Sequence, residues 1–177
     1  METRIYGILF TQGKTTTDAY THLLTSYTDA DFTGDLDDRK STSRWLYTFK
    51  SSPISWASKK QGLVTRSSME SELVAGSFAS VEGIWLIQLG RDFKHDFIPI
   101  PLFTDNQSFI SYSQNDLGST RTKHVDIHYH YTRDQVASGN IKLHYISTRE
   151  NLADILTKPL SPRKHAYLLD SLGVTHV

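Results

Sequence analysis

Residues 26–43 read SYTDADFTGDLDDRKSTS and hold five aspartates in ten positions, directly after an apolar strand pattern. The chain as a whole is not acidic, because its 177 residues include 19 Lys and Arg against 19 Asp and Glu. Two explanations fit such a stretch. It is either a solvated loop or a metal site whose first ligand lies at the end of a strand, and the surrounding sequence has to distinguish them.

The strand before these aspartates opens a three-strand pattern. It runs through HLLTSYTDADF (22–32) and is followed by RWLYTFK (44–50) and PISWASK (53–59), both rich in β-branched and aromatic residues. This order predicts an antiparallel meander. Asp29 ends the first strand and Asp31 shares its face, because side chains alternate with a period of two, so either could be a ligand.

The remaining aspartates of the stretch fit a turn. Gly34 and the acidic side chains around it suit tight backbone geometry between the first two strands. The residues expected there are Asp35, Asp37 and Asp38.

The longest helical pattern covers residues 67–93. Ser67 and Glu70 have the spacing of a capping box, which predicts a helix that starts at Ser67. Glu70 and Glu72 point about 200° apart on a helix, so only one can face a site, and the capping role of Glu70 favours Glu72.

This helix carries two stripes. We expect the apolar one to be a packing face and the small one, roughly opposite, to allow a close approach to a neighbouring element. The apolar stripe is Val74, Phe78, Val81, Trp85 and Leu89, and the small stripe is Ala75, Gly76, Ala79 and Gly83.

The second half of the chain alternates strands and helices. We expect strands in FIPIPLFTDNQS (97–108) and NIKLHYIS (140–147), and helices in SFISYSQN (108–115), 122–139, TRENLADILTK (148–158) and SPRKHAYLLDSLG (161–173). Antiparallel strands followed by βα units predict an α/β fold, a mixed sheet with helices on both faces.

Four acidic residues lie at or near the ends of separate elements, where one edge of such a sheet would gather them: Asp29, Glu72, Asp105 and Asp154. Clusters of oxygen ligands suit Mg²⁺. Two such ions about 4 Å apart can activate a water and stabilise the leaving oxygen of a phosphodiester. Because strand-end aspartates are often only turn residues, the pattern alone leaves both explanations open.

Six motifs carry a family resemblance: YTDADFTGDLDDRKSTS, PISWASKKQ, SSMESELVAG, TDNQS, RTKHVDIHYHYTRDQV and LADILTKPL. In this order, from about Tyr27 to Leu160, they closely resemble the ribonuclease H domain of the Pol polyprotein of Ty1/copia-type LTR retrotransposons. The resemblance implies a ribonuclease H-like fold, a five-stranded mixed sheet flanked by helices. It also implies hydrolysis of the RNA strand of RNA–DNA hybrids with two Mg²⁺ ions, or Mn²⁺, held by Asp29, Glu72, Asp105 and Asp154.

The same resemblance divides the chain and suggests its partners. Residues 1–22 would be the link from an upstream reverse transcriptase, 23–160 the ribonuclease H-like domain, and 161–177 a C-terminal helix and tail. We expect an intracellular protein, in a cytoplasmic particle or the nucleus, that works with the reverse transcriptase region. No uninterrupted apolar run approaches 18 residues, so no membrane segment is expected.

Two other functions remain open. The chain could be an inactive or co-opted remnant that only binds nucleic acid, although all four carboxylates are present. It could also be a nuclease of the same fold that acts on DNA, since a fold does not imply one function.

Residues expected to contact nucleic acid fall into two groups. Asn106, Gln107 and Ser108 follow Asp105 and could contact the 2′-hydroxyls by which RNA is told from DNA. Candidates for phosphate contacts are Lys59, Lys60, Arg66, Arg121, Lys123 and Arg133.

The chain also departs from the family. Arg44 stands where a glycine is common, and it would strain a turn if an unusual backbone angle were needed there. Cellular enzymes of this fold often carry a histidine just before the last acidic residue, where this chain has STREN (147–151). His124 and His128 have the i, i+4 spacing of zinc ligands, but no convincing third ligand is near, so we expect packed or phosphate-facing side chains.

Overall fold

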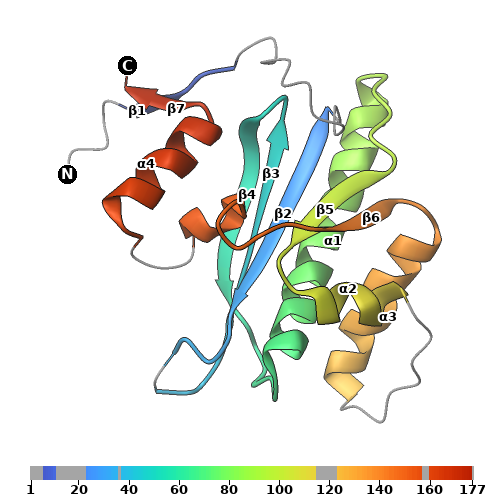
Figure 1. Cartoon of the computed structure of the whole chain (residues 1–177). Coiled ribbons are helices and arrows are strands. Elements are labelled where there is room, and N and C mark those ends of the chain that lie inside the picture. Colours follow the sequence, from blue (N-terminus) through green and yellow to red (C-terminus); the bar gives the residue numbers. More distant parts are fainter. Residues whose placement is uncertain (1–5, 11–22, 36, 115–122, 157–159, 177) are drawn as a thin grey trace.

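A five-stranded mixed sheet forms the centre of the computed structural model, which describes residues 6–10, 23–35, 37–114, 123–156 and 160–176, without the side chains of 123–125. The strand order is β4-β3-β2-β5-β6 (Figure 1). The strands are β2 (Leu24–Asp31), β3 (Thr42–Phe49), β4 (Ser52–Lys60), β5 (Ile100–Thr104) and β6 (Ile141–Tyr145). β2, β3 and β4 pair antiparallel, whereas β5 is parallel to β2 and to β6. The predicted meander and mixed sheet are thus confirmed.

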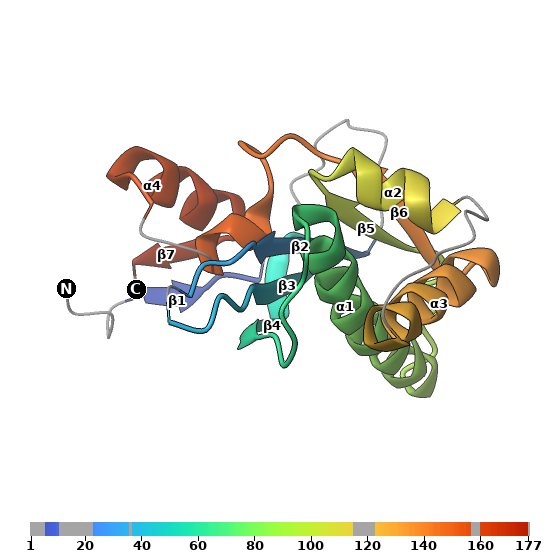
Figure 2. The ribbon, with the colours of Figure 1, turned by 90° about the horizontal axis from the view of Figure 1, so that it is seen from below.

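Helices cover both faces of the sheet, as Figure 2 shows from below. On one face lie α1 (Ser68–Asp92), α2 (Gln107–Gln114) and α3 (Lys123–Ala137), whose apolar side chains share a core with β5 and β6. On the other face lie the short 3₁₀ helix η2 (Leu152–Leu156) and α4 (Pro162–Ser171), which pack against Leu46 of β3. The chain ends meet in a separate small sheet, where β1 (Tyr6–Ile8) pairs antiparallel with β7 (Val174–His176).

The expected apolar packing face of α1 is confirmed at Val74, which is buried, and at Phe78, which stacks on Trp45, but it was wrong for the C-terminal half of the helix. Val81, Trp85 and Leu89 are exposed, whereas the small stripe is buried. The reason is distance, because a Cβ at Gly76 would overlap the ring of Phe109, and one at Gly83 would lie 2.6 Å from the Tyr47 hydroxyl. Small side chains therefore let α1 lie directly on the sheet and on α2. Length and composition alone would allow α1 to cross a membrane, but 61% of its apolar window is buried inside this fold.

The helix ends follow the capping signals. Ser67 caps α1 by accepting the backbone N–H of Glu70 at 3.2 Å, and the Glu70 carboxylate accepts the N–H of Arg66 at 2.7 Å. Ser161 caps α4 in the same way, with Pro162 as the first helical residue. Glu70 is therefore occupied at the helix start.

The helix predicted for residues 148–158 is confirmed only in part, because the described residues 148–156 contain the short 3₁₀ helix η2 and no α-helix. The side-chain amide of Asn151 explains why η2 begins at Leu152 rather than at residue 148. It donates to the Thr28 carbonyl at 3.0 Å and accepts the N–H of Ala153 at 3.1 Å, so it caps a short turn and ties that turn to β2. Pro159, the predicted helix end, lies outside the described residues.

Candidate metal centre

Two parallel strands carry the same local pattern, aromatic–Thr–Asp, β5 at its end and β2 two residues before its end. Tyr27 of β2 is in register with Phe103 of β5, and their rings stack with centroids 5.5 Å apart. Asp29 and Asp105 each follow two residues later, so both lie on the same face at the carboxyl ends of adjacent strands. This equivalence brings two carboxylates side by side.

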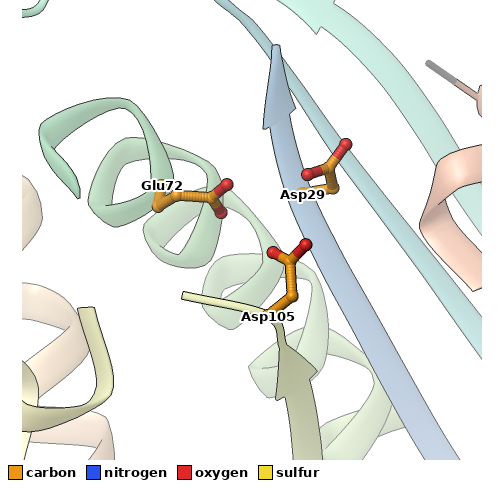
Figure 3. Close-up of side chains that lie close together, drawn as sticks. All are labelled: Asp29, Glu72 and Asp105. Atoms are coloured by element: carbon orange, nitrogen blue, oxygen red, sulfur yellow. The ribbon is translucent and has the colours of Figure 1, made fainter. Parts of the chain in front are cut away.

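Glu72 approaches the two aspartates from α1. One of its carboxylate oxygens accepts the backbone N–H of Ala30 at 3.2 Å, and the other is buried without a hydrogen-bond partner among the described residues. Asp29, Glu72 and Asp105 each offer an oxygen, and these atoms lie within 4.8 Å of one another (Figure 3). The structure thus brings together three of the four carboxylates expected from the sequence.

Asp154 lies beside this cluster rather than inside it. Its carboxylate is buried in η2 and contacts the ammonium of Lys164 from α4. Its charge is near enough to Asp29 to help raise the pKa of Asp29. The fourth carboxylate therefore flanks the other three and has its own cation.

The negative charge of the cluster is not fully compensated by nearby positively charged groups. Burial, followed by the charges of Asp154 and Asp105, raises the pKa of Asp29 to about 6, against a lowering by Arg44. Burial and then the charges of Asp29 and Asp105 raise the pKa of Glu72 well above its usual value. Such shifts favour protonation or the arrival of a cation. An all-oxygen donor set with an unpartnered buried oxygen fits a hard divalent ion such as Mg²⁺ or Mn²⁺.

Arg44 is the cation nearest to Asp29. It lies in β3 directly opposite Asp29, and its buried guanidinium is 3.5 Å from Asp29 and 3.3 Å from Asp31. Arg44 is inside a strand, and its φ is not among the positive values recorded for the described residues, so the expected turn strain is not found. The meander could have revealed this contact, since its register sets residue 44 against residue 29.

The loop after β6 contributes a second contact that the sequence reasoning missed. The hydroxyl of Thr148 donates to the Asp105 carboxylate at 2.6 Å, and the Thr148 carbonyl accepts from Lys164 at 3.1 Å. This residue belongs to STREN, where related enzymes often carry a histidine. No feature of the sequence marked Thr148 or Lys164, because both act through contacts made only after folding.

The residues proposed for 2′-hydroxyl contacts lie next to the cluster. The side-chain oxygen of Asn106 accepts the N–H of Phe109 at 2.8 Å and so caps α2. Gln107 and Ser108 are exposed in the first turn of that helix. Asn106 therefore has a structural role already, whereas its two neighbours face solvent beside Asp105.

The proposed phosphate ligands are more scattered. Lys59 lies over the ring of Phe78, 5.4 Å from its centroid, and Arg133 lies 5.8 Å from the centroid of Tyr129. Lys60 is engaged by two aspartates of the β2–β3 turn, and Arg66 is exposed just before α1. Arg121 and the side chain of Lys123 lie outside the described residues.

The histidines of α3 do not form a metal site among the residues described. His128 is half-buried, its Nδ1 lies 2.9 Å from the Ser77 hydroxyl, and burial lowers its pKa. His130 pairs with Asp126 at 3.5 Å, and the side chain of His124 is not described. Where side chains are described, Asp29, Glu72 and Asp105 form the only group of three or more such residues whose ligand atoms are close enough to share an ion.

Comparison with curated proteins finds long matches to plant transposon proteins. The chain is 38% identical over 152 residues, 86% of its length, to the Retrovirus-related Pol polyprotein from transposon TNT 1-94 of Nicotiana tabacum. It is also 38% identical over 176 residues, 97% of its length, to that from transposon RE2 of Arabidopsis thaliana. It spans only 11% and 12% of these relatives. A shorter match, 43% identical over 84 residues, covers 48% of the chain and 55% of Secreted RxLR effector protein 161 of Plasmopara viticola. No protein-family model matches the chain.

Solved structures share the fold. LC11-RNase H1 in complex with RNA/DNA hybrid aligns with a TM-score of 0.55 at 14% identity, over 75% of this chain and 92% of that one. The Prototype Foamy Virus Protease-Reverse Transcriptase aligns with a TM-score of 0.53 at 12% identity, over 93% of this chain and 22% of that one. At these identities the matches establish a ribonuclease H-like fold and no more.

Proposed function

Because the chain is a homologue of Ty1/copia-type Pol polyproteins with a ribonuclease H-like fold, we propose that it is a ribonuclease H that hydrolyses the RNA strand of RNA–DNA hybrids. The observation that carries the proposal is the convergence of Asp29, Glu72 and Asp105, whose oxygens lie within 4.8 Å of one another. Three carboxylates from β2, α1 and the end of β5 gain nothing in stability from being buried together unless a cation joins them.

Asp29, Glu72, Asp105 and Asp154 would hold two divalent cations, and the chemistry such ions would supply is activation of the attacking water and stabilisation of the leaving 3′ oxygen. The remaining contacts keep the donors in place. The N–H of Ala30 holds one oxygen of Glu72, and the hydroxyl of Thr148 holds one oxygen of Asp105. The site is thus preorganised on two strand ends and one helix rather than on mobile side chains.

Substrate selectivity would depend on groups around the cluster. Gln107 and Ser108 are exposed beside Asp105, where they could meet the 2′-hydroxyls of the wide minor groove. Lys59 and Arg66 are exposed near the start of α1 and could contact phosphates. The name of the foamy virus protein supports a reverse transcriptase region as the partner. An intracellular setting is part of the same proposal.

The test is cleavage of an RNA–DNA duplex labelled on the RNA strand, with Mg²⁺ or Mn²⁺. We expect the RNA strand of the hybrid to be cut and RNA–RNA and DNA–DNA duplexes of the same sequence to remain intact. Asp105→Asn and Glu72→Gln should abolish cutting. Glu70→Gln is the matched control, because Glu70 lies two residues from Glu72 but caps the helix, and it should retain activity. Cleavage that survives both cluster substitutions would remove the proposed site.

Binding without cleavage is the competing proposal. Two features favour it, since Arg44 and Lys164 already occupy Asp29 and Asp154. Under this alternative the wild-type chain would bind the hybrid in a gel-shift assay and leave its RNA strand whole with either metal.

A further inference from the structure

Lys164 of α4 contacts the surroundings of the carboxylate cluster on two sides. Its ammonium pairs with Asp154 and donates to the Thr148 carbonyl at 3.1 Å. The hydroxyl of the same threonine donates to Asp105 at 2.6 Å. One lysine from the C-terminal helix therefore touches the flanking carboxylate and the loop that holds a carboxylate of the cluster.

The two halves of the candidate metal centre consequently differ in the positive charge that already contacts their carboxylates in the absence of a metal ion. The Asp29–Glu72–Asp105 half has closely spaced oxygens, one of which is buried and has no hydrogen-bond partner in the part of the chain that the structure describes. The Asp154 half has a buried carboxylate, 4% exposed, that already has a cation against it. A divalent ion can join the first half directly, but it must share or displace Lys164 at the second.

We propose that Lys164 competes with a divalent cation for Asp154, so that the metal centre fills in order, first at the three-carboxylate cluster and then at Asp154. The inference rests on the proposed function, since it concerns the metal ions of that site. It assigns α4 a role in metal occupancy, beyond its packing against the sheet.

Competition follows from charge and geometry. An ammonium and a divalent cation repel each other strongly at contact distance in a partly buried site. The lysine can withdraw, because it sits on a flexible four-carbon stem and its side chain is 28% exposed, so its head can return to water. Asp154 is fixed by its buried position in η2 and cannot follow.

The experiment is a titration of the full chain with Mn²⁺, with free ion followed by electron paramagnetic resonance. The wild-type chain should bind one ion tightly and a second more weakly. Lys164→Met should tighten the second ion about tenfold or more, as expected when a competing charge-assisted hydrogen bond is removed, and leave the first within about twofold. Lys164→Arg, which keeps the charge, should resemble the wild type.

Arg163→Met is the matched control, because it removes one positive charge from an exposed neighbour on the same helix. It should leave both affinities unchanged. A general electrostatic effect would change them in both Met variants, and that result would overturn the competition.

Melting temperatures give a second readout that does not depend on activity. Without metal, Lys164→Met should melt below the wild type, because it leaves Asp154 buried without its cation. Saturating Mn²⁺ should raise its melting temperature more than that of the wild type. If the second affinity and the Mn²⁺-induced rise are equal in both chains while one ion still binds, the competition is wrong and the metal site stands. If no chain binds Mn²⁺, the proposed metal site fails along with it.

Discussion

The aspartate-rich stretch contains two arrangements of the same kind, one buried and one exposed. In each, a cation from β3 or β4 lies between two aspartates, and in the exposed one Lys40 also lies 3.7 Å from Asp38. Arg44 is 3.5 and 3.3 Å from Asp29 and Asp31, whereas Lys60 is 2.5 and 2.9 Å from Asp35 and Asp38. The pKa values nevertheless shift in opposite directions, that of Asp29 up to about 6 and that of Asp35 down to about 2.

Solvent explains the opposite signs. The Lys60 side chain is 47% exposed, so water solvates the charges there and its hydrogen bond favours the ionised aspartate. The Arg44 side chain is 3% exposed, and the loss of hydration around Asp29 outweighs the attraction of the guanidinium. A short ion pair is therefore a poor guide to function. The longer, buried pair is the one attached to the candidate metal centre.

The largest contrast should appear in catalysis. Asp29→Asn should lower the rate of RNA cleavage in the hybrid at least about 100-fold, because a carboxylate that holds metal is lost. Asp35→Asn removes the same charge six positions away and should stay within about twofold of the wild type. Initial rates of cleavage at saturating Mg²⁺ give the comparison. Equal losses of rate in both variants would show that the two regions do not differ in function.

Stability should show the next contrast. Without metal at pH 7.5, Arg44→Met should lower the free energy of unfolding by about 3 kcal/mol, because it leaves a buried carboxylate without its partner. Lys60→Met should lower the melting temperature by less than about 3 °C, since exposed ion pairs contribute little. Urea denaturation with EDTA measures the first and calorimetry the second. A loss at Lys60 as large as that at Arg44 would show that burial does not separate the pairs.

Local signals were enough to predict much of the fold. Alternating side chains predicted β2, β3 and β4, and capping residues predicted the start of α1 at Ser67. Hydrophobicity did not predict the buried face of α1 correctly, because the short distance between α1 and its neighbours admits only small side chains along the small stripe. The exposed side of α1 carries Trp85 and the buried side carries Gly76. The stripe of small residues did predict this close approach, but nothing local showed that the far end of the apolar stripe would be left in solvent.

The acidic residues of the candidate site were also predictable from the sequence, whereas most of their contacts were not. The positions of Asp29 and Asp105 near the ends of their strands, together with the family resemblance, predicted that they meet. The register of the meander could have revealed the contact of Arg44 with Asp29. The contacts of Thr148 and Lys164 were not predictable, because they depend on the packing of distant elements. In a sequence, a buried arginine and a solvated one look alike.

The pH dependence of stability should sharpen the comparison further. The folded pKa of Asp29, about 6, is raised above its ordinary value of 3.8, so its contribution to stability is fully present below about pH 4 and is lost as the pH rises through about 6. Without metal, the free energy of unfolding of Asp29→Asn should therefore rise by about 2 kcal/mol relative to that of the wild type as the pH is raised from 4 to 7.5. Unfolding free energies in EDTA across this range test the sign. A difference that does not vary with pH would contradict the raised pKa.

The smallest effect should come from Asp35, and with the opposite sign. Its folded pKa, about 2, lies below the ordinary 3.8, so its stabilisation is present above about pH 4 and is lost as the pH falls towards 2. Asp35→Asn should melt no more than about 3 °C below the wild type at pH 7, because exposed ion pairs contribute little. The gap should close towards pH 2 and shrink in about 1 M salt, which screens exposed charges. Calorimetric melting curves of the two chains provide the measurement. If the difference in melting temperature persisted at pH 2 or in salt, the Asn substitution would be acting through the backbone contacts of the turn. The exposed ion pair would then not be a valid comparison for the Arg44–Asp29 pair.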